Sequence, residues 1–356
     1  MTADSMTDDR LGVESRPFRA VHPLALAYGG FGAILLLSIA IVALLGSSVR
    51  VAPVLRLAIQ PPTKTVIATP RAWVPSPAQA ALPPITAPVH AGNALVADPA
   101  LIEANENGPL PRIAADGRTP MQAYAAPVAD GGKPRIAIVI AGLGISAKAT
   151  TAALASLPSQ VTLAFAPSGT DVQHWVSDAR GRGHEVLLEV PMEPFDFPDS
   201  DPGPHTLRAG VAETANTEKL VWALTRATGY TGITNLAGGR LLSDPDSLSP
   251  VLTFIARRGL LFYDNGQAQH SVSSDVAGRT GTAIAQATAT IDAVQTPEEI
   301  DRQLSALETE ARAHGFASGT GSLYPVTLQR VSQWAQGLSG RGFVLVPVSS
   351  IVAAKK

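Results

Sequence analysis

The chain has 356 residues, with 27 Lys and Arg against 29 Asp and Glu, so its formal net charge is −2. This balance argues against a nucleic-acid partner, because phosphate-binding surfaces normally carry an excess of basic residues. Hydrophobic residues make up 46% of the chain, which is enough for a globular core. The lack of cysteine excludes disulfides, thiolate zinc sites, iron–sulfur clusters and a cysteine nucleophile.

A continuous apolar segment lies near the start of the chain. Residues 24–46 hold 23 amino acids without a charge; as a helix they would span about 34 Å, enough for a hydrocarbon core of about 30 Å. A cleaved signal peptide is the alternative, but its apolar region is shorter and ends in an A-x-A-like site, which is missing here. We therefore predict an uncleaved membrane anchor. Basic residues flank it on both sides, so their count alone does not orient it.

The composition changes after the apolar segment. Residues 47–132 contain 14 prolines in 86 positions, mixed with Ala and Thr. No helical or strand period survives such a proline density. The sequence predicts a disordered, semi-extended linker that tethers a globular domain at 133–356.

In 133–356, short apolar runs alternate with amphipathic stretches. The runs are 136–140, 161–165, 186–190, 231–234, 260–263, 289–291, a weak one near 316, and 343–346. The stretches are 171–182, 214–227, 244–257, 297–314 and 326–338. Asp244 and Thr296, each followed by proline, are expected helix N-caps. Alternating β and α elements predict a parallel sheet, either open and doubly wound or closed as a barrel, and seven or eight units favour a (β/α) barrel.

The functional groups of such a barrel stand at the C-terminal ends of its strands. The polar residues expected there are Glu193, Asn235, Asp264, Asp292 and Ser322. Three carboxylates and an amide would converge around one opening and give a polar pocket with acid–base capacity. For Asp264 and Asp292 the alternative role is the N-cap of the following helix.

Two other features carry less weight. Gly142-x-Gly144-x-x-Ala147 follows a strand as in dinucleotide-binding folds, but the acidic residue expected about 20 positions later is missing. His184 precedes its strand and therefore falls near the opposite face, where a structural role is expected. Neither feature predicts a cofactor site.

Several motifs appear in order along the globular domain. The most specific is Gly183-His-Glu-Val-Leu-Leu188 followed by Pro191-Met-Glu-Pro194, and Asn235 with Gly238 continues the series. Together these motifs resemble the divergent polysaccharide deacetylases, a branch of the carbohydrate esterase (β/α)-barrel superfamily, over about residues 134–352. The resemblance implies a hydrolase that removes acetyl groups from N-acetyl sugars with a divalent metal. It also implies that the domain is periplasmic and that residues 1–23 are a cytoplasmic tail.

The metal-binding positions of that family are substituted here. The acidic pair after the first strand is replaced by Ala141-Gly142, and the two histidine positions hold Leu236 and Ser322. Metal-assisted deacetylation needs these ligands, because the cation polarises the amide carbonyl and activates a bound water. We therefore expect no metal and no other cofactor.

Two functions remain after these substitutions. The first is a membrane-anchored domain that binds a cell-envelope polysaccharide, a peptidoglycan-type glycan or a protein partner, with the usual catalysis lost. The alternative is an active envelope hydrolase that uses the remaining carboxylates Glu193, Asp264 and Asp292, with Asn235 and Ser322 binding substrate.

Overall fold

The computed structural model describes residues 97–128 and 132–352. The predicted tail at 1–23 and the predicted anchor at 24–46 lie outside these residues, as does most of the predicted linker. Among the helices of the described residues, none is long and apolar enough to cross a membrane.

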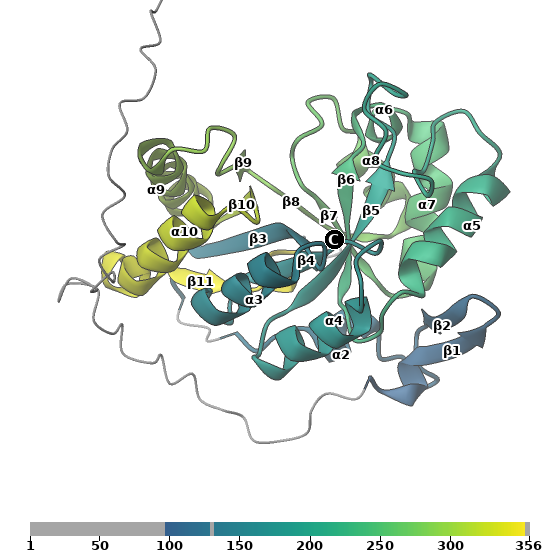
Figure 1. The fold of residues 1–356 in the computed structure, drawn as a ribbon, viewed down its shortest axis with the longest axis horizontal. Coiled ribbons are helices and arrows are strands. Elements are labelled where there is room, and N and C mark those ends of the chain that lie inside the picture. The colour runs from purple at the N-terminus through teal and green to yellow at the C-terminus, as the bar shows by residue number, and fades with distance from the viewer. Residues whose placement is uncertain (1–96, 129–131, 353–356) are drawn as a thin grey trace, which may run out of the picture. The chain divides into compact units, whose positions relative to one another are not determined.

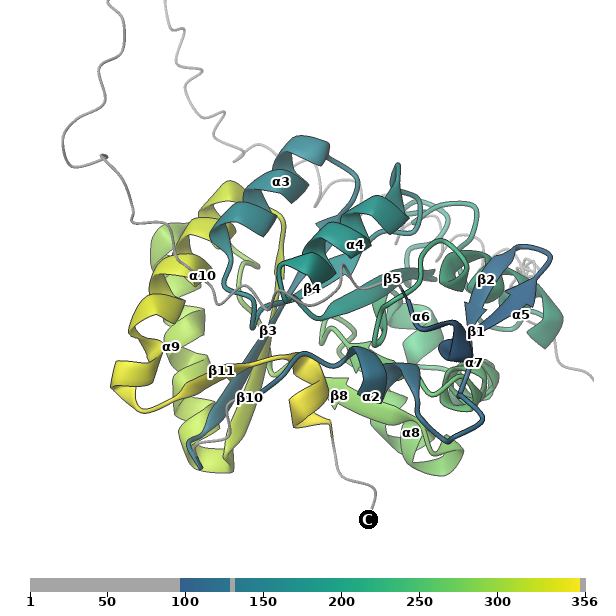
Figure 2. The same ribbon diagram turned by 90° about the horizontal axis from the view of Figure 1, so that it is seen from below.

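Residues 132–352 alternate strands and helices. The strands are β3 (Arg135–Leu143), β4 (Thr162–Phe165), β5 (Val186–Met192), β6 (Gly232–Ala237), β7 (Leu261–Asp264), β8 (Ala283–Gln286), β9 (Ala289–Thr290), β10 (Phe316–Ser322) and β11 (Val344–Val346). The helices are α3 (Ala147–Ser156), α4 (Val172–Gly181), α5 (Glu213–Leu224), α6 (Gly239–Leu242), α7 (Pro245–Arg257), α8 (Ser273–Thr280), α9 (Pro297–His314) and α10 (Pro325–Leu338), followed by the 3-10 turns η4 (Ser339–Arg341) and η5 (Val348–Ile351). In Figures 1 and 2 the long helices lie outside the strands.

All strands of the large sheet are parallel, in the order β8-β7-β6-β5-β4-β3-β10-β9, and β11 pairs with the start of β3. The strands at the two ends of this order, β8 and β9, are separated by only Ala287 and Thr288 in the chain. The sheet must therefore curl until its ends approach each other. This half-barrel confirms the predicted parallel α/β architecture.

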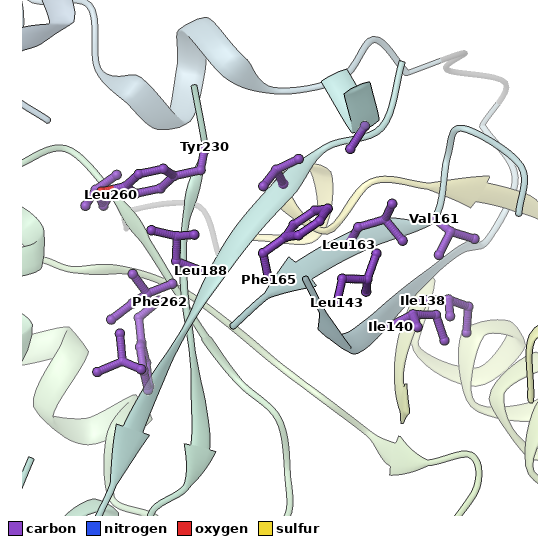
Figure 3. Packing of buried hydrophobic residues seen from close by; sticks show 14 of the residues in the cluster. Ile138, Ile140, Leu143, Val161, Leu163, Phe165, Leu188, Tyr230, Leu260 and Phe262 are labelled. Atoms are coloured by element: carbon purple, nitrogen blue, oxygen red, sulfur yellow. The ribbon is translucent and has the colours of Figure 1, made fainter. Parts of the chain in front are cut away.

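Side chains alternate between the two faces of the curled sheet, as the strand period requires. Ile138 and Ile140 of β3 belong to the cluster that packs against the helices, part of which is shown in Figure 3. Val139 between them belongs to a second cluster on the inner face, with Leu187 of β5 and Tyr263 of β7. These buried residues fix which side chains of each strand point inward.

Both predicted helix caps are present. The Asp244 carboxylate accepts hydrogen bonds from the backbone N–H of Asp246 and Ser247 at the start of α7. The Thr296 hydroxyl accepts one from the N–H of Glu299 at the start of α9. Each cap satisfies donors that a helix N-terminus leaves free.

The strand near Phe316, which the sequence indicated only weakly, is one of the longest in the sheet. β10 pairs with β3 over seven positions, although its sequence is Phe-Ala-Ser-Gly-Thr-Gly-Ser. A Cβ at Gly319 would lie 2.6 Å from a methyl carbon of Leu307 and 2.9 Å from Ile291. Glycine is needed here because α9 and the segment after β9 pack directly on the backbone of β10. The glycines take the place of the large apolar residues from which a strand is predicted.

The predicted linker is wrong over its described part. Residues 97–128 contain η3 (Pro99–Leu101), β1 (Ile102–Asn105), β2 (Gly108–Pro111) and α2 (Pro120–Tyr124). Strands β1 and β2 form an antiparallel pair, and Leu110 is buried in the main core. Thr119 and Gln122 form a reciprocal capping box at the start of α2.

The prolines of this region occupy positions that tolerate them. Pro99 and Pro120 lie at helix N-termini, where a missing N–H costs nothing. Pro109 and Pro111 lie in a two-stranded ribbon, in which every strand is an edge strand. An ion pair between Glu103 and Arg258 joins this ribbon to α7 and its following turn. Proline count alone therefore did not distinguish a tether from a packed extension.

Candidate functional site

The residues predicted at strand ends all lie at the C-terminal side of the sheet. Glu193 follows β5, Asn235 lies in β6, Asp264 ends β7, Asp292 follows β9 and Ser322 ends β10. We call the loops that follow the strands the strand-end face. The strand order places β5, β6 and β7 together and β9 beside β10. The five residues therefore form two groups on this face.

Asp264 is the centre of a local hydrogen-bond network. Its Oδ2 accepts bonds from the hydroxyls of Ser271 and Ser273, both at 2.6 Å, and its Oδ1 accepts one from the N–H of Gly266 at 3.0 Å. The side chain of Gln286 adds a longer contact at 3.4 Å. Asp264 is 1% exposed. Its carboxylate therefore holds the loop after β7 against the start of α8, and it is not the N-cap of that helix, which is Val272.

Asp292 and Ser322 contact each other. The Asp292 Oδ2 accepts bonds from the backbone N–H of Ser322 at 2.7 Å and from the Thr327 hydroxyl at 2.8 Å. This carboxylate joins the loop after β9 to the end of β10 and the first turn of α10. The N-cap of α9 is Thr296, so the alternative N-cap role is also absent for Asp292.

Glu193 and Asn235 are likewise bound to neighbouring segments. The Glu193 Oε2 accepts a bond from the N–H of Ala209 at 2.7 Å. Asn235 forms a reciprocal pair with Asn265: its Oδ1 accepts the Asn265 N–H at 3.0 Å, and its Nδ2 donates to the Asn265 Oδ1 at 3.0 Å. Both residues are buried. They order the loops of the strand-end face.

The residues at the metal-ligand positions implied by the resemblance cannot hold the divalent metal of that family. Gly142 has no side chain, and its N–H donates to a carboxylate. Leu236 presents an apolar side chain that is 39% exposed. Within 97–128 and 132–352, no three His, Cys, Asp or Glu side chains are grouped so as to hold a metal ion. His184 lies near the opposite end of its strand, with Nδ1 2.9 Å from the carbonyl of Val161, and burial lowers its pKa.

Glu189 is a functional candidate that the sequence analysis did not select. It lies in β5 between Leu188 and Val190. Because it is two residues from Leu187, its side chain points to the same inner face of the sheet. Its Oε2 accepts a bond from the N–H of Gly142 at 3.2 Å. Burial raises the pKa of Glu189 to about 7, which makes it a group able to exchange a proton near neutral pH. A lone acid inside an otherwise apolar strand was the available signal.

Thr234 is the neighbour of Glu189 in the sheet register. Its hydroxyl is buried and has no hydrogen-bond partner among the described residues. Glu185, at the other end of β5, differs from Glu189 because its carboxylate accepts bonds from the Ser349 N–H and the Thr162 hydroxyl. The inner face of the sheet thus carries two carboxyl groups in different settings. Glu185 accepts several hydrogen bonds, whereas Glu189 accepts the N–H of Gly142 and lies beside the unpaired hydroxyl of Thr234.

Exposed apolar side chains surround the strand-end face. Of the eight large hydrophobic residues that are exposed in the described part of the chain, five lie in the loops after strands or at strand ends. These five, which we call the apolar rim, are Ile145, Phe195, Leu236, Val294 and Tyr324. Phe195 is 61% exposed and Tyr324 is 40% exposed. Exposed apolar groups concentrated on one face are typical of a binding surface.

Comparison with known proteins identifies a matching family model and two related proteins. The model of the divergent polysaccharide deacetylase family matches residues 138–352. An uncharacterized protein of Haemophilus influenzae is 24% identical over 194 residues, which cover 54% of this chain and 68% of the relative. The uncharacterized protein YibQ of Escherichia coli is 25% identical over 231 residues, or 65% of this chain and 70% of the relative.

A solved structure extends the comparison to the fold. An uncharacterized protein from Agrobacterium tumefaciens, whose crystal structure is known, is 40% identical to this chain in sequence, and the two structures superpose with a TM-score of 0.68. The match covers 69% of this chain and all of that one. The matched family model, these relatives and the curled parallel sheet agree, and the chain belongs to the divergent polysaccharide deacetylase family.

Proposed function

We propose that this protein is a membrane-anchored glycan-binding protein of the cell envelope, whose strand-end face binds the saccharide without the metal-dependent catalysis of deacetylases. The observation that carries this proposal is the apolar rim. Sugar rings present apolar C–H faces that pack on aromatic and aliphatic side chains, while their hydroxyls bond to polar groups nearby. Phe195 and Tyr324 supply two such aromatic surfaces.

The hydrogen bonds of the carboxylates support binding over catalysis. Asp264 and Asp292 each accept at least two bonds from protein donors, and Glu193 accepts one. A nucleophile or metal ligand needs free lone pairs directed at the reacting group. These carboxylates instead shape the loops that present the apolar rim.

Binding of N-acetylated oligosaccharides tests the proposal. We expect the double variant Phe195→Ala/Tyr324→Ala to bind about fivefold to 150-fold more weakly, because each aromatic contact contributes about 0.5–1.5 kcal/mol. Titration calorimetry of the purified protein measures the Kd. The control is Phe316→Ala, an exposed phenylalanine at the opposite end of β10. Absence of saturable binding to the unaltered protein, or an equal loss in Phe316→Ala, would refute the proposal.

One observation favours the alternative of an active hydrolase. A general acid or base works best with a pKa near the pH of the reaction, and the pKa of Glu189 is about 7. If Glu189 is that group, the protein will release acetate from N-acetylated oligosaccharides in the presence of EDTA, and Glu189→Gln will abolish the release. Binding without acetate release would exclude this alternative.

The membrane topology is part of the same proposal. The uncharged segment 24–46 anchors the protein in the inner membrane, with 1–23 in the cytoplasm and the globular domain in the periplasm. We expect protease added outside spheroplasts to remove the domain and leave a short stub in the membrane. A domain that is protected until the membrane is lysed would contradict this topology.

A further inference from the structure

A groove separates the first turns of two helices beside the strand-end face. Its volume is about 320 Å³, close to the lower end of the range for small-molecule sites. It lies between α5 and α7, which are neighbours in Figure 1. Leu220, Pro250 and Val251 give it an apolar lining. The groove is therefore large enough for a small ring with one apolar face.

The charged side chains of the groove are both acidic. Glu213 and Asp246 line it, each in the first turn of its helix, and no basic side chain does. Neither carboxylate forms a salt bridge with any residue that the structure describes. Within the described part of the chain, the groove thus presents two acidic side chains and no basic one.

Two residues that line the groove, Asp246 and Thr217, also carry further oxygen acceptors. Pro250 lies inside α7 and has no N–H, so the carbonyl of Asp246 loses its usual donor four residues later. Thr217 adds a hydroxyl to the lining. A carbonyl, a hydroxyl and two carboxylates accept hydrogen bonds from hydroxyl and ammonium groups.

The groove adjoins the proposed glycan surface. One wall is the loop after β5, in which the N–H of Gly210 donates to the Ser247 hydroxyl at 2.9 Å. The preceding residue, Ala209, is held by the carboxylate of Glu193. Since α5 and α7 both begin on the strand-end side, a saccharide on the apolar rim can extend into the groove.

We propose that the groove between α5 and α7 binds a sugar unit with a free amino group, an unacetylated hexosamine in the glycan. This inference rests on the proposed glycan-binding function and specifies it further. The two carboxylates attract the ammonium group, the carbonyl and hydroxyl bond to it or to ring hydroxyls, and the apolar lining contacts the C–H face. An N-acetyl group carries no charge and is bulkier, so it gains nothing from the carboxylates.

The test compares glucosamine oligomers with N-acetylglucosamine oligomers of equal length, both titrated into the purified protein. We expect tighter binding of the glucosamine oligomers. The double variant Glu213→Gln/Asp246→Asn should weaken their binding about tenfold, consistent with two partly exposed charge pairs, and leave the binding of the N-acetylated oligomers unchanged. Both substitutions are on exposed side chains, and an unchanged melting temperature verifies that the fold persists.

The matched control is Glu218→Gln/Asp275→Asn. It makes the same change in net charge at exposed positions of α5 and α8 that do not line the groove. Equal loss in this control would assign the effect to overall charge and overturn the proposal. If the N-acetylated oligomers bind and depend on Phe195 while the glucosamine oligomers are unaffected by the groove variant, the groove proposal fails and the glycan function remains. If neither oligomer binds the unaltered protein, both fail.

Discussion

Replacing Asp264 by alanine is expected to lower the free energy of unfolding by about 3–5 kcal/mol. The change removes the acceptor of the Ser271 and Ser273 hydroxyls and of the Gly266 N–H, and Ser273 is fully buried. The buried hydroxyl of Ser273 costs about 1–3 kcal/mol when it is left without an acceptor, and the two part-buried bonds from Ser271 and Gly266 to the charged carboxylate account for the rest of the expected size. Urea denaturation at pH 7 measures the effect as a lower midpoint at an unchanged slope.

Two further variants make this expectation specific. Asp264→Asn keeps one acceptor oxygen and should cost less than Asp264→Ala. Asp275→Ala, on the exposed side of the first turn of α8, should leave the midpoint nearly unchanged. If Asp264→Ala has the midpoint of the unaltered protein but loses ligand binding, its carboxylate belongs to the binding site and our structural assignment is wrong. A loss of activity together with stability would carry no information about catalysis.

The position of the strand-end residues could be predicted from the sequence, but their roles could not. Alternation of apolar runs and amphipathic stretches identifies parallel strands, and it places Asp264 and Asp292 at their C-terminal ends. Whether a carboxylate is free depends on donors supplied by other segments. For Asp292 these are the N–H of Ser322 and the hydroxyl of Thr327, which are 30 or more residues away in the chain. No local pattern encodes that contact.

The same limit explains why the sequence indicates β10 only weakly and why it predicts a linker over residues 97–128. β10 has few large apolar residues because helix α9 packs directly on its backbone, and this packing requires glycine at Gly319. Residues 97–128 look like a tether because proline breaks hydrophobic periods, yet Leu110 and Tyr124 are buried. In both cases packing against distant parts of the chain outweighs local propensity.

Glu189 shows the opposite case, in which a local signal existed. An acid in the middle of an apolar strand is rarely buried unless it is paired or serves a function. The alternation along β5 assigns it to the inner face, where Tyr263 and Thr234 also lie. The sequence could not show that Glu189 forms no salt bridge with any residue that the structure describes, because this depends on every strand that faces it.

Glu189→Gln is expected to make the protein more stable at alkaline pH and to leave it unchanged at acidic pH. Burial raises the pKa of Glu189 from 4.5 to about 7, so the folded state holds its proton more tightly than the unfolded state does. As the pH rises from about 4.5 to about 7, the unfolded state releases this proton first, and the stability of the unaltered protein falls. The full difference is about 3 kcal/mol above pH 7.

Glutamine cannot ionise, and its amide oxygen can still accept the N–H of Gly142. The difference in free energy of unfolding between Glu189→Gln and the unaltered protein should therefore be near zero at pH 4.5 and should grow to about 3 kcal/mol at pH 8. Glu185, whose pKa burial also raises, is present in both proteins, so its contribution cancels in the difference. Urea denaturation at intervals between pH 4.5 and 8 provides the two curves, with Glu218→Gln on the exposed side of α5 as the control. Parallel curves for Glu189→Gln and the unaltered protein would mean that the pKa of Glu189 is the same in the folded and the unfolded state, and would also remove the support for its role as a general acid or base.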